Sequence, residues 1–505
     1  MEGSNIRRNI RTSGILLPVS SLPSPHGIGS LGKEAYNFID FLKKAGQHYW
    51  QILPVGPTGC GDSPYQSFSA FAANPYLIDL DMLEKQGLLT QSEISSAWFG
   101  DDPEFVDYGA LYENRVPLLS RAARRLSPQN AFFQSFCKEN ADWLDDYALF
   151  MALKEENGMG SFQNWPAPLR LRDRDAIHDA QVRLADRVHV WKAIQYFFFT
   201  QWDALTAYAH TNGIELVGDL PIYVSPDSAD LWTHPDLFLV DGELKPTEVS
   251  GCPPDAFAPT GQLWGNPLYN WERMERDDYD WWIQRLNAAM RIYDVVRIDH
   301  FRGFESYYAI PATDKDATGG HWCKGPGIRF INILKKRIPK IRIIAEDLGF
   351  LTDDVRQLLK ESGFPGMKVL QFAFDSREES DYLPYRYERN CVVYTGTHDN
   401  TTTEDWQYSA PPKDVEYAKR YLNVTRADEF TYAMIRAALG SVADTCIIPM
   451  QDYLCLGARA RMNVPGTVGG NWRWRVSREA LTPELAEKIR SLSDLYGRVE
   501  QPKNI

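Results

Sequence analysis

The chain has 505 residues, enough for one large barrel with insertions or for two or three domains of average size. Its 44% hydrophobic and 24% charged residues are typical of a globular protein, and no run of 18 apolar residues predicts a membrane helix, so we expect no membrane partner. The net charge of −13 argues against general nucleic-acid binding, which needs a basic surface to replace the counterions of phosphate.

Eight short apolar segments predict β-strands, and most of them are followed by a helical pattern. Near-continuous apolar strands that alternate with helices predict a parallel sheet covered on both faces. Eight such units favour a (β/α)8 TIM barrel, with a doubly wound open sheet as the alternative. The segments are, in chain order, 14–19, 49–55, 214–219, 295–299, 341–347, 368–374, 391–397 and 444–450.

Amphipathic stretches such as 31–46 and 327–338 predict the helices between these strands. The spacing is uneven, because roughly 155 residues separate the second and third strands and about 75 separate the third and fourth. We therefore expect residues 1–505 to form a single catalytic barrel with two insertions at its C-terminal face. The first spans about 56–185 and is largely helical, and the second spans about 220–290.

Several familiar motifs point away from cofactor chemistry. The segment GIGSLG (27–32) fits the dinucleotide pattern, but two prolines separate it from the preceding strand, and the next strand ends without an acid. There is no phosphate-binding loop, no GxSxG elbow and no paired-histidine metal motif, so we expect no cofactor and no metal. Seven cysteines without a CxxC pair, and a start without a signal-peptide core, favour a cytoplasmic location.

Four of the predicted strands end in acids. These are Asp219 (IELVGDL), Asp299 (VVRIDH), Glu346 (IRIIAED) and Asp399 (YTGTHDN). The carboxyl ends of barrel strands surround one mouth, so the four acids are expected to converge there. For a single acid, helix N-capping is the more economical interpretation, but four converging acids favour a catalytic site.

The neighbours of two acids suggest different charge states. Arg297 lies two residues before Asp299, on the same face of its strand, and is expected to keep that carboxylate ionised. Glu346 follows three apolar residues, a setting that favours the protonated acid. An ionised nucleophile beside a protonated acid is the pairing that retaining glycoside chemistry requires.

Long patterns in a fixed order give the sequence a resemblance to a known family. They include SGILLPVSSLPSPHGIGSLG (13–32), SPYQSFSAFAANPYLIDL (63–80), GDLPIYVSPDSADLW (218–232), PPDAFAPTGQLWGNPLYNW (253–271), VVRIDHFRGF (295–304), IAEDLG (344–349), GTHDN (396–400) and ARMNVPGTVGGNWRWR (460–475). The chain resembles the 4-α-glucanotransferases, also called amylomaltases or disproportionating enzymes, of the α-amylase clan. This resemblance implies a (β/α)8 barrel with inserted subdomains and no separate C-terminal β-domain. The sequence agrees, since only about 55 residues follow the eighth strand.

The resemblance also implies roles for individual residues. Asp299 would be the nucleophile, Glu346 the general acid/base and Asp399 the transition-state stabiliser. The residues expected to bind the sugar are Arg297, His300, His398, Asp219, Ser63, Tyr65, Asp255, Gln262, Trp264 and Asn463. The 251–271 segment would shield the intermediate from water, and its Pro and Gly content favours an ordered loop rather than a strand.

The implied activity is transfer of α-1,4-glucan segments from a maltooligosaccharide or starch-type donor to the 4-hydroxyl of an acceptor glucan or glucose, by retaining double displacement. Its partners would be α-1,4-glucans and maltooligosaccharides. Two alternatives remain at this stage: an α-1,4-glucan hydrolase, and a catalytically inactive glucan-binding protein on the same fold.

Overall fold

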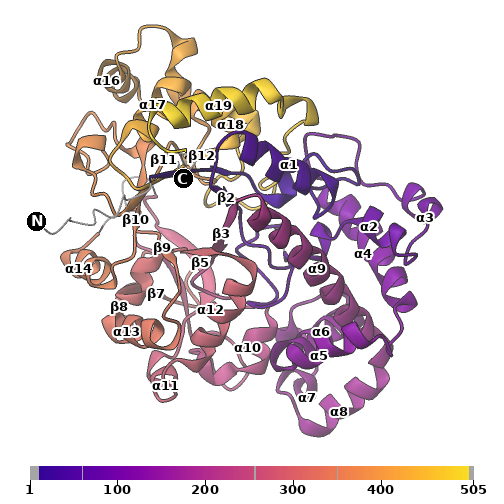
Figure 1. Cartoon of the computed structure of the whole chain (residues 1–505). Helices are drawn as coiled ribbons and strands as arrows, with labels where there is room; N and C mark the ends of the chain where they lie inside the picture. Colours follow the sequence, from indigo (N-terminus) through magenta and orange to yellow (C-terminus); the bar gives the residue numbers. More distant parts are fainter. Residues whose placement is uncertain (1–10, 60, 255–257, 350, 500–505) are drawn as a thin grey trace, which may run out of the picture.

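The computed structural model describes residues 11–59, 61–254, 258–349 and 351–499. Eight parallel strands form one sheet in the order β10-β11-β12-β1-β2-β3-β6-β9, with helices around it (Figure 1). The strands are β1 (Thr12–Leu16), β2 (Tyr49–Gln51), β3 (Glu215–Leu220), β6 (Val295–Ile298), β9 (Ile343–Ala345), β10 (Gly366–Val369), β11 (Cys391–Tyr394) and β12 (Thr445–Pro449). The two end strands meet where the Ala345 N–H donates to the Pro365 carbonyl at 2.9 Å, just before β10. The predicted strands and the barrel are confirmed, and the open doubly wound sheet is wrong.

The interior of the barrel is a separate apolar cluster to which all eight strands contribute. Side chains of a strand alternate between its two faces, so one set points inward and the other packs against the surrounding helices. The inward cluster is filled and leaves no pore, as in other barrels of this kind. Its members are Leu16, Tyr49, Val217, Val295, Ile344, Met367, Val392, Tyr394 and Ile447.

Helices cover the outside of the barrel and fill its long connections. The amphipathic stretches predicted at 31–46 and 327–338 form α1 and α13. The helices before β3 are α1 (Lys33–Lys44), α2 (Leu80–Lys85), α3 (Gln91–Ser95), α4 (Tyr108–Arg125), α5 (Ala131–Glu139), α6 (Ala141–Glu156), α7 (Ala167–Arg170), α8 (Arg174–Arg183) and α9 (Ala185–Thr211). The later ones are α10 (Ala229–Thr233), α11 (Trp271–Glu275), α12 (Asp280–Ile292), α13 (Gly327–Arg337), α14 (Asp353–Ser362), α15 (Thr403–Ser409), α16 (Pro412–Leu422), α17 (Phe430–Gly440), α18 (Met450–Tyr453) and α19 (Pro483–Leu495).

The long helix α9 joins the helical connection to the barrel. Helices α2–α8 lie together on one side of the barrel, and α9 runs from them back to β3 (Figure 1). Two buried glutamines of α9 clamp the segment before α2: the side-chain amide of Gln195 bonds both main-chain groups of Ala73, and that of Gln201 bonds both of Asp79, at 2.7–3.0 Å. These four hydrogen bonds hold in place the loop that leads from β2 over the mouth of the barrel.

A second, antiparallel sheet forms where the sequence predicted an ordered loop. Its order is β5-β4-β7-β8, with β4 (Glu248–Cys252), β5 (Gln262–Pro267), β7 (Ser306–Pro311) and β8 (His321–Lys324). The expectation that 251–271 contains no strand is therefore wrong. Gly251 was interpreted as a loop signal, but it lies within β4 because a Cβ there would come within 2.2 Å of the Gln262 carbonyl oxygen on β5. Glycine inside a strand marks such a close approach as readily as it marks a loop.

After β12 the described chain forms helices α18 and α19 and irregular segments, without a separate C-terminal β-domain. Helix α19 packs against α1, and the side-chain amide of Gln47 donates to the Ser493 hydroxyl at 3.0 Å. Among the residues with a described position, no helix is long and apolar enough to cross a membrane.

Close packing around β3 predicts that a side chain at position 218 destabilises the fold. Its neighbours along the strand point inward, so Gly218 faces outward, where a Cβ would come within 2.1–2.2 Å of the Tyr293 ring. We expect Gly218→Ala to lower the free energy of unfolding by about 1–3 kcal/mol or more, because the ring has to be displaced. Urea unfolding measures this change, with Gly242→Ala as the control, since nothing lies within 4 Å of a Cβ at Gly242. Equal stability of the two variants would contradict the packing described for β3.

Candidate active site

The predicted acids converge at the carboxyl ends of the strands. Asp219, Arg297 and Glu346 each come two residues after an interior side chain of their own strand, so they continue its inward face above the filled barrel. Asp299 follows β6, and Asp399 lies in the loop after β11. The alternating period of the strands thus brings the charged groups to one mouth.

A buried ion pair between β3 and β6 forms the floor of the site. Arg297 Nη1 lies 2.6 and 2.7 Å from the two carboxylate oxygens of Asp219, and the side chains are 3% and 0% exposed. The two residues are direct partners in the parallel register of β3 and β6. The same Nη1 lies 3.1 Å from Asp299 Oδ1. One guanidinium therefore serves two carboxylates, and Asp219 is its closer partner.

Tyr65, from the loop after β2, connects this pair to the loop after β11. Its hydroxyl donates to Asp219 Oδ2 at 2.8 Å and lies 2.8 Å from His398 Nε2. Since the single hydroxyl proton goes to the carboxylate, His398 Nε2 carries a proton and donates to Tyr65. The two rings are stacked, with centroids 5.4 Å apart.

Asp399 is held by donors on both of its oxygens. His398 Nε2 lies 3.2 Å from Oδ2, and the side-chain amide of Asn463 donates to Oδ1 at 2.7 Å. Burial alone would raise the pKa of Asp399, but these two donors outweigh it and hold the pKa well below its usual range. Asp399 is therefore ionised at neutral pH.

Asp299 is in a more balanced environment. Burial raises its pKa, the guanidinium of Arg297 lowers it, and the charges of Asp219 and Asp399 raise it again, to about 6. Arg297 thus acts in the expected direction, but burial outweighs it because the guanidinium is shared with Asp219.

Glu346 has the highest pKa of the three predicted catalytic acids, about 7. Burial is the main cause, and the nearby charge of Asp299 adds to it. Two main-chain donors oppose the rise: the Leu348 N–H reaches Oε1 at 2.9 Å and the His300 N–H reaches Oε2 at 2.6 Å. The three acids therefore differ in pKa, although all lie at the same mouth and none is fully exposed.

Two histidine nitrogens at the mouth are buried and have no hydrogen-bond partner within the described part of the chain. They are His300 Nε2 and His398 Nδ1. Burial and the charge of Arg302 lower the pKa of His300 to about 3, so its imidazole is neutral and offers one donor or acceptor at Nε2. Each nitrogen is chemically suited to a hydroxyl group of a bound molecule.

The remaining predicted sugar-binding residues differ in how closely they approach the acids and histidines of the site. Trp264 of β5 packs edge-to-face on His300, with centroids 4.8 Å apart, and its indole N–H donates to the Gln262 side chain. The hydroxyl of Ser63 accepts from the Tyr65 N–H at 3.3 Å, a contact within its own turn. Asp255 lies outside the residues that the structure describes.

Two contact residues, Arg461 and Met367, had not been singled out from the sequence, whereas a third, Trp472, lies in a segment that the resemblance had placed near the site. Arg461 Nη2 donates to the Asp399 carbonyl at 3.1 Å, and Met367 Sδ lies 3.4 Å from Arg297 Nε. Trp472, inside the GGNW segment (469–472), packs against the Tyr65 and His398 rings at 5.7 and 5.9 Å between centroids. Inward alternation along β10 was a usable signal for Met367, but nothing local marked Arg461.

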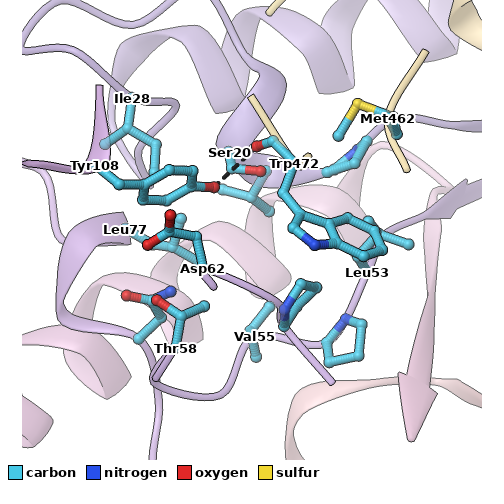
Figure 2. A pocket seen from close by; sticks show the side chains of 15 residues that line it. Ser20, Ile28, Leu53, Val55, Thr58, Asp62, Leu77, Tyr108, Met462 and Trp472 are labelled. Carbon is cyan, nitrogen blue, oxygen red and sulfur yellow. Dashed lines mark hydrogen bonds between the residues drawn. The ribbon is translucent and has the colours of Figure 1, made fainter. Parts of the chain in front are cut away.

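A small cavity lies behind Trp472 (Figure 2). Its volume is about 30 Å³, room for one or two water molecules and too little for a sugar ring. The Tyr108 hydroxyl donates to the Trp472 carbonyl at 2.8 Å across its rim, and the Asp62 carboxylate lies below the Tyr108 ring (Figure 2). The residues around the cavity therefore support Trp472, which packs against Tyr65 and His398 at the site. Elsewhere too, no group of three or more described His, Cys, Asp or Glu residues is arranged to hold a metal ion.

The closed barrel and the acids at its mouth define a (β/α)8-barrel enzyme. Residues 17–482 match the family model described as 4-alpha-glucanotransferase. The 4-alpha-glucanotransferase of Clostridium butyricum is 46% identical over 95% of this chain and all of its own length, and that of Thermus thermophilus is 45% identical over 97% and 99%. The solved amylomaltase of Streptococcus agalactiae in complex with acarbose is 39% identical, with a TM-score of 0.94 over 97% of this chain and all of its own. The chain belongs to the 4-alpha-glucanotransferase family.

The Asp219–Arg297 pair gives a stability prediction. Arg297→Met leaves the fully buried Asp219 without its cation, which we expect to cost about 3–5 kcal/mol in the free energy of unfolding. Arg426→Met, which breaks the exposed pair with Asp428, is the control and should leave stability unchanged. Urea unfolding of both variants makes the comparison. A loss in the first variant no larger than in the control would show that the pair is not a structural requirement.

Proposed function

We propose that the chain transfers α-1,4-glucan segments between glucans by a retaining double displacement, with Asp299 as nucleophile, Glu346 as general acid/base and Asp399 as transition-state stabiliser. The observation that carries the proposal is the convergence of these three acids, with different pKa values, at the mouth of a barrel of this family. A hydrolase is the weaker candidate, because the relatives are transferases.

In the first step, Glu346 donates its proton to the glycosidic oxygen while an Asp299 carboxylate oxygen attacks the anomeric carbon. The bond from that carbon to the leaving 4-oxygen breaks, and a covalent β-glucosyl-enzyme forms. This step needs Asp299 ionised and Glu346 protonated. With pKa values raised to about 6 and about 7, the pair carries one proton between these two pH values, and that proton resides mainly on Glu346.

Asp399 acts on the sugar that carries the reacting carbon. Its carboxylate accepts hydrogen bonds from the 2- and 3-hydroxyls, and these strengthen as positive charge develops on the flattened ring. His398 and Asn463 keep Asp399 ionised for this task. The unpaired nitrogens of His300 and His398 supply further contacts for sugar hydroxyls.

In the second step, the 4-hydroxyl of an acceptor glucan loses its proton to Glu346 and attacks the same carbon. The bond to Asp299 breaks, the product regains the α-configuration, and Glu346 is again protonated. The two inversions together give retention.

Transfer rather than hydrolysis requires that water stay away from the intermediate. We assign the cover to the 251–271 segment, because Trp264 packs on His300 beside both reacting acids. Acarbose occupies the related Streptococcus agalactiae amylomaltase, which supports an α-glucan as the substrate class here.

We also assign the two long connections, about 56–185 and 220–290, to inserted subdomains, the first of which supplies Tyr65. A cytoplasmic location stays a prediction from the sequence.

Incubation with maltotriose tests the activity. We expect glucose and maltooligosaccharides longer than maltotriose, with little net gain in reducing ends, because each cleaved bond is replaced by another. A steady rise in reducing ends would establish a hydrolase, and the absence of any product would establish an inactive binding protein. Asp299→Asn should lose nearly all turnover, about a thousandfold or more, since no covalent intermediate forms. Asp354→Asn, at an exposed carboxylate, is the control and should keep it.

A further inference from the structure

His300 has a backbone conformation that side-chain-bearing residues seldom adopt. Its φ of 50° and ψ of 49° lie in the left-handed region, two residues after the end of β6 and just before the short 3₁₀ turn Phe301–Phe304. This conformation is strained for an L-residue, and such strain persists only where surrounding contacts hold it.

The left-handed turn aims two successive N–H groups at one residue. The His300 N–H donates to Glu346 Oε2 at 2.6 Å, and the Phe301 N–H donates to the Glu346 carbonyl oxygen at 3.1 Å. The first of these donors reaches the side-chain carboxylate, and the second reaches a neutral main-chain carbonyl of the same residue. The turn therefore contacts both the side chain and the main chain of Glu346.

Further main-chain contacts hold the His300 turn and the segment of Glu346 against each other. The Glu346 N–H donates to the Ile298 carbonyl at 3.0 Å, and the Gly303 N–H donates to the His300 carbonyl at 2.9 Å. On the other side of the carboxyl group, the Leu348 N–H reaches Oε1. Each oxygen of Glu346 thus faces one main-chain donor, and the donor at Oε2 depends on the turn at His300.

We propose that His300 is a positioning residue that acts through its main chain: its left-handed conformation aims a peptide N–H at Glu346, which orients the acid/base and sets the pH at which it gives up its proton. The inference rests on the proposed role of Glu346. It is separate from any contact that the imidazole makes with a sugar.

The other charged and titratable groups around Glu346 come from three segments. Asp299 raises its pKa, Arg297 lowers it, and Arg302 lies on the 3₁₀ turn. Asp347 is the next residue on its own chain, and Tyr382 approaches from the loop after β10. None of them is itself changed by replacing His300. The imidazole itself, with a pKa lowered to about 3, does not titrate near neutral pH.

Four substitutions separate the effect of the main-chain conformation from the effect of the imidazole ring. His300→Gly, His300→Asn, His300→Ala and His300→Val all remove the imidazole. Glycine and asparagine tolerate the left-handed conformation, alanine less so, and β-branched valine least. The readout is the pH profile of kcat/KM for maltotriose disproportionation, whose alkaline limb reports loss of the proton from the general acid in the free enzyme.

We expect all four variants to lose activity at the optimum through the missing ring, but only the alanine and valine variants to shift the alkaline limb. A carboxylate without its N–H donor holds its proton more tightly, so the limb should move upward by about one pH unit. In the glycine and asparagine variants it should stay within about 0.3 units of the original enzyme.

An unmoved limb in both the alanine and valine variants, or an equal shift in all four, would overturn the inference, since the main-chain turn would then have no separate effect. If the valine variant does not fold, as judged by circular dichroism, the alanine variant alone decides by the same criterion. Glu346→Gln, measured in parallel, distinguishes a failure of the proposed role of Glu346 from a failure of the proposed role of His300. If that variant keeps full activity and its alkaline limb, the proposed role of Glu346 fails; if it loses them while the limb is unmoved in the series, only the role of His300 fails.

Discussion

The buried ion pair between Asp219 and Arg297 is the interaction on which the whole site depends. It joins neighbouring strands β3 and β6 directly above the apolar barrel interior, where an uncompensated charge would be costly. Tyr65 reaches the site by bonding Asp219, and Asp299 shares the guanidinium of Arg297. Through Tyr65 the pair also reaches His398, and from there Asp399. The connections after β2, β6 and β11 are thus fixed in place relative to one pair of charges.

One cation among several acids at the mouth also explains how the acids divide their tasks. Burial raises the pKa of each, and the number and kind of its donors decides how far. Asp399 has the amide of Asn463 and the His398 N–H, which it shares with Tyr65, and it is ionised at neutral pH. Asp299 has a share of Arg297 and is ionised above about pH 6, whereas Glu346 has only main-chain N–H donors and the charge of Asp299 beside it. The arrangement yields a nucleophile and an acid from side chains of the same chemistry.

The sequence was sufficient for the barrel and its acids, because both follow from local periodicity. Eight apolar runs gave the strands, and the two-residue alternation placed Asp219, Arg297 and Glu346 on one face. It was insufficient where contacts join distant segments. The bond from Tyr65 to His398 spans 333 positions, and no local pattern marks it.

Two further features were out of reach for related reasons. The strands β4 and β5 looked like a loop, since the glycine that permits their close approach is also a common loop residue. The left-handed turn at His300 depends on tertiary hydrogen bonds to Glu346, so the residue type alone does not reveal it. Side-chain chemistry was therefore easier to predict than the main-chain donors that tune it.

Covalent trapping tests the central claim most directly, namely that Asp299 carries the glucan between donor and acceptor. In Glu346→Gln, a maltotriosyl fluoride donor needs no proton for its leaving group, but the second step lacks its base, so the intermediate should accumulate. Peptide mapping by mass spectrometry should then find one maltotriosyl unit on the peptide that contains Asp299. A label on the peptide with Asp399, or turnover of the fluoride without any labelled peptide, would contradict the mechanism.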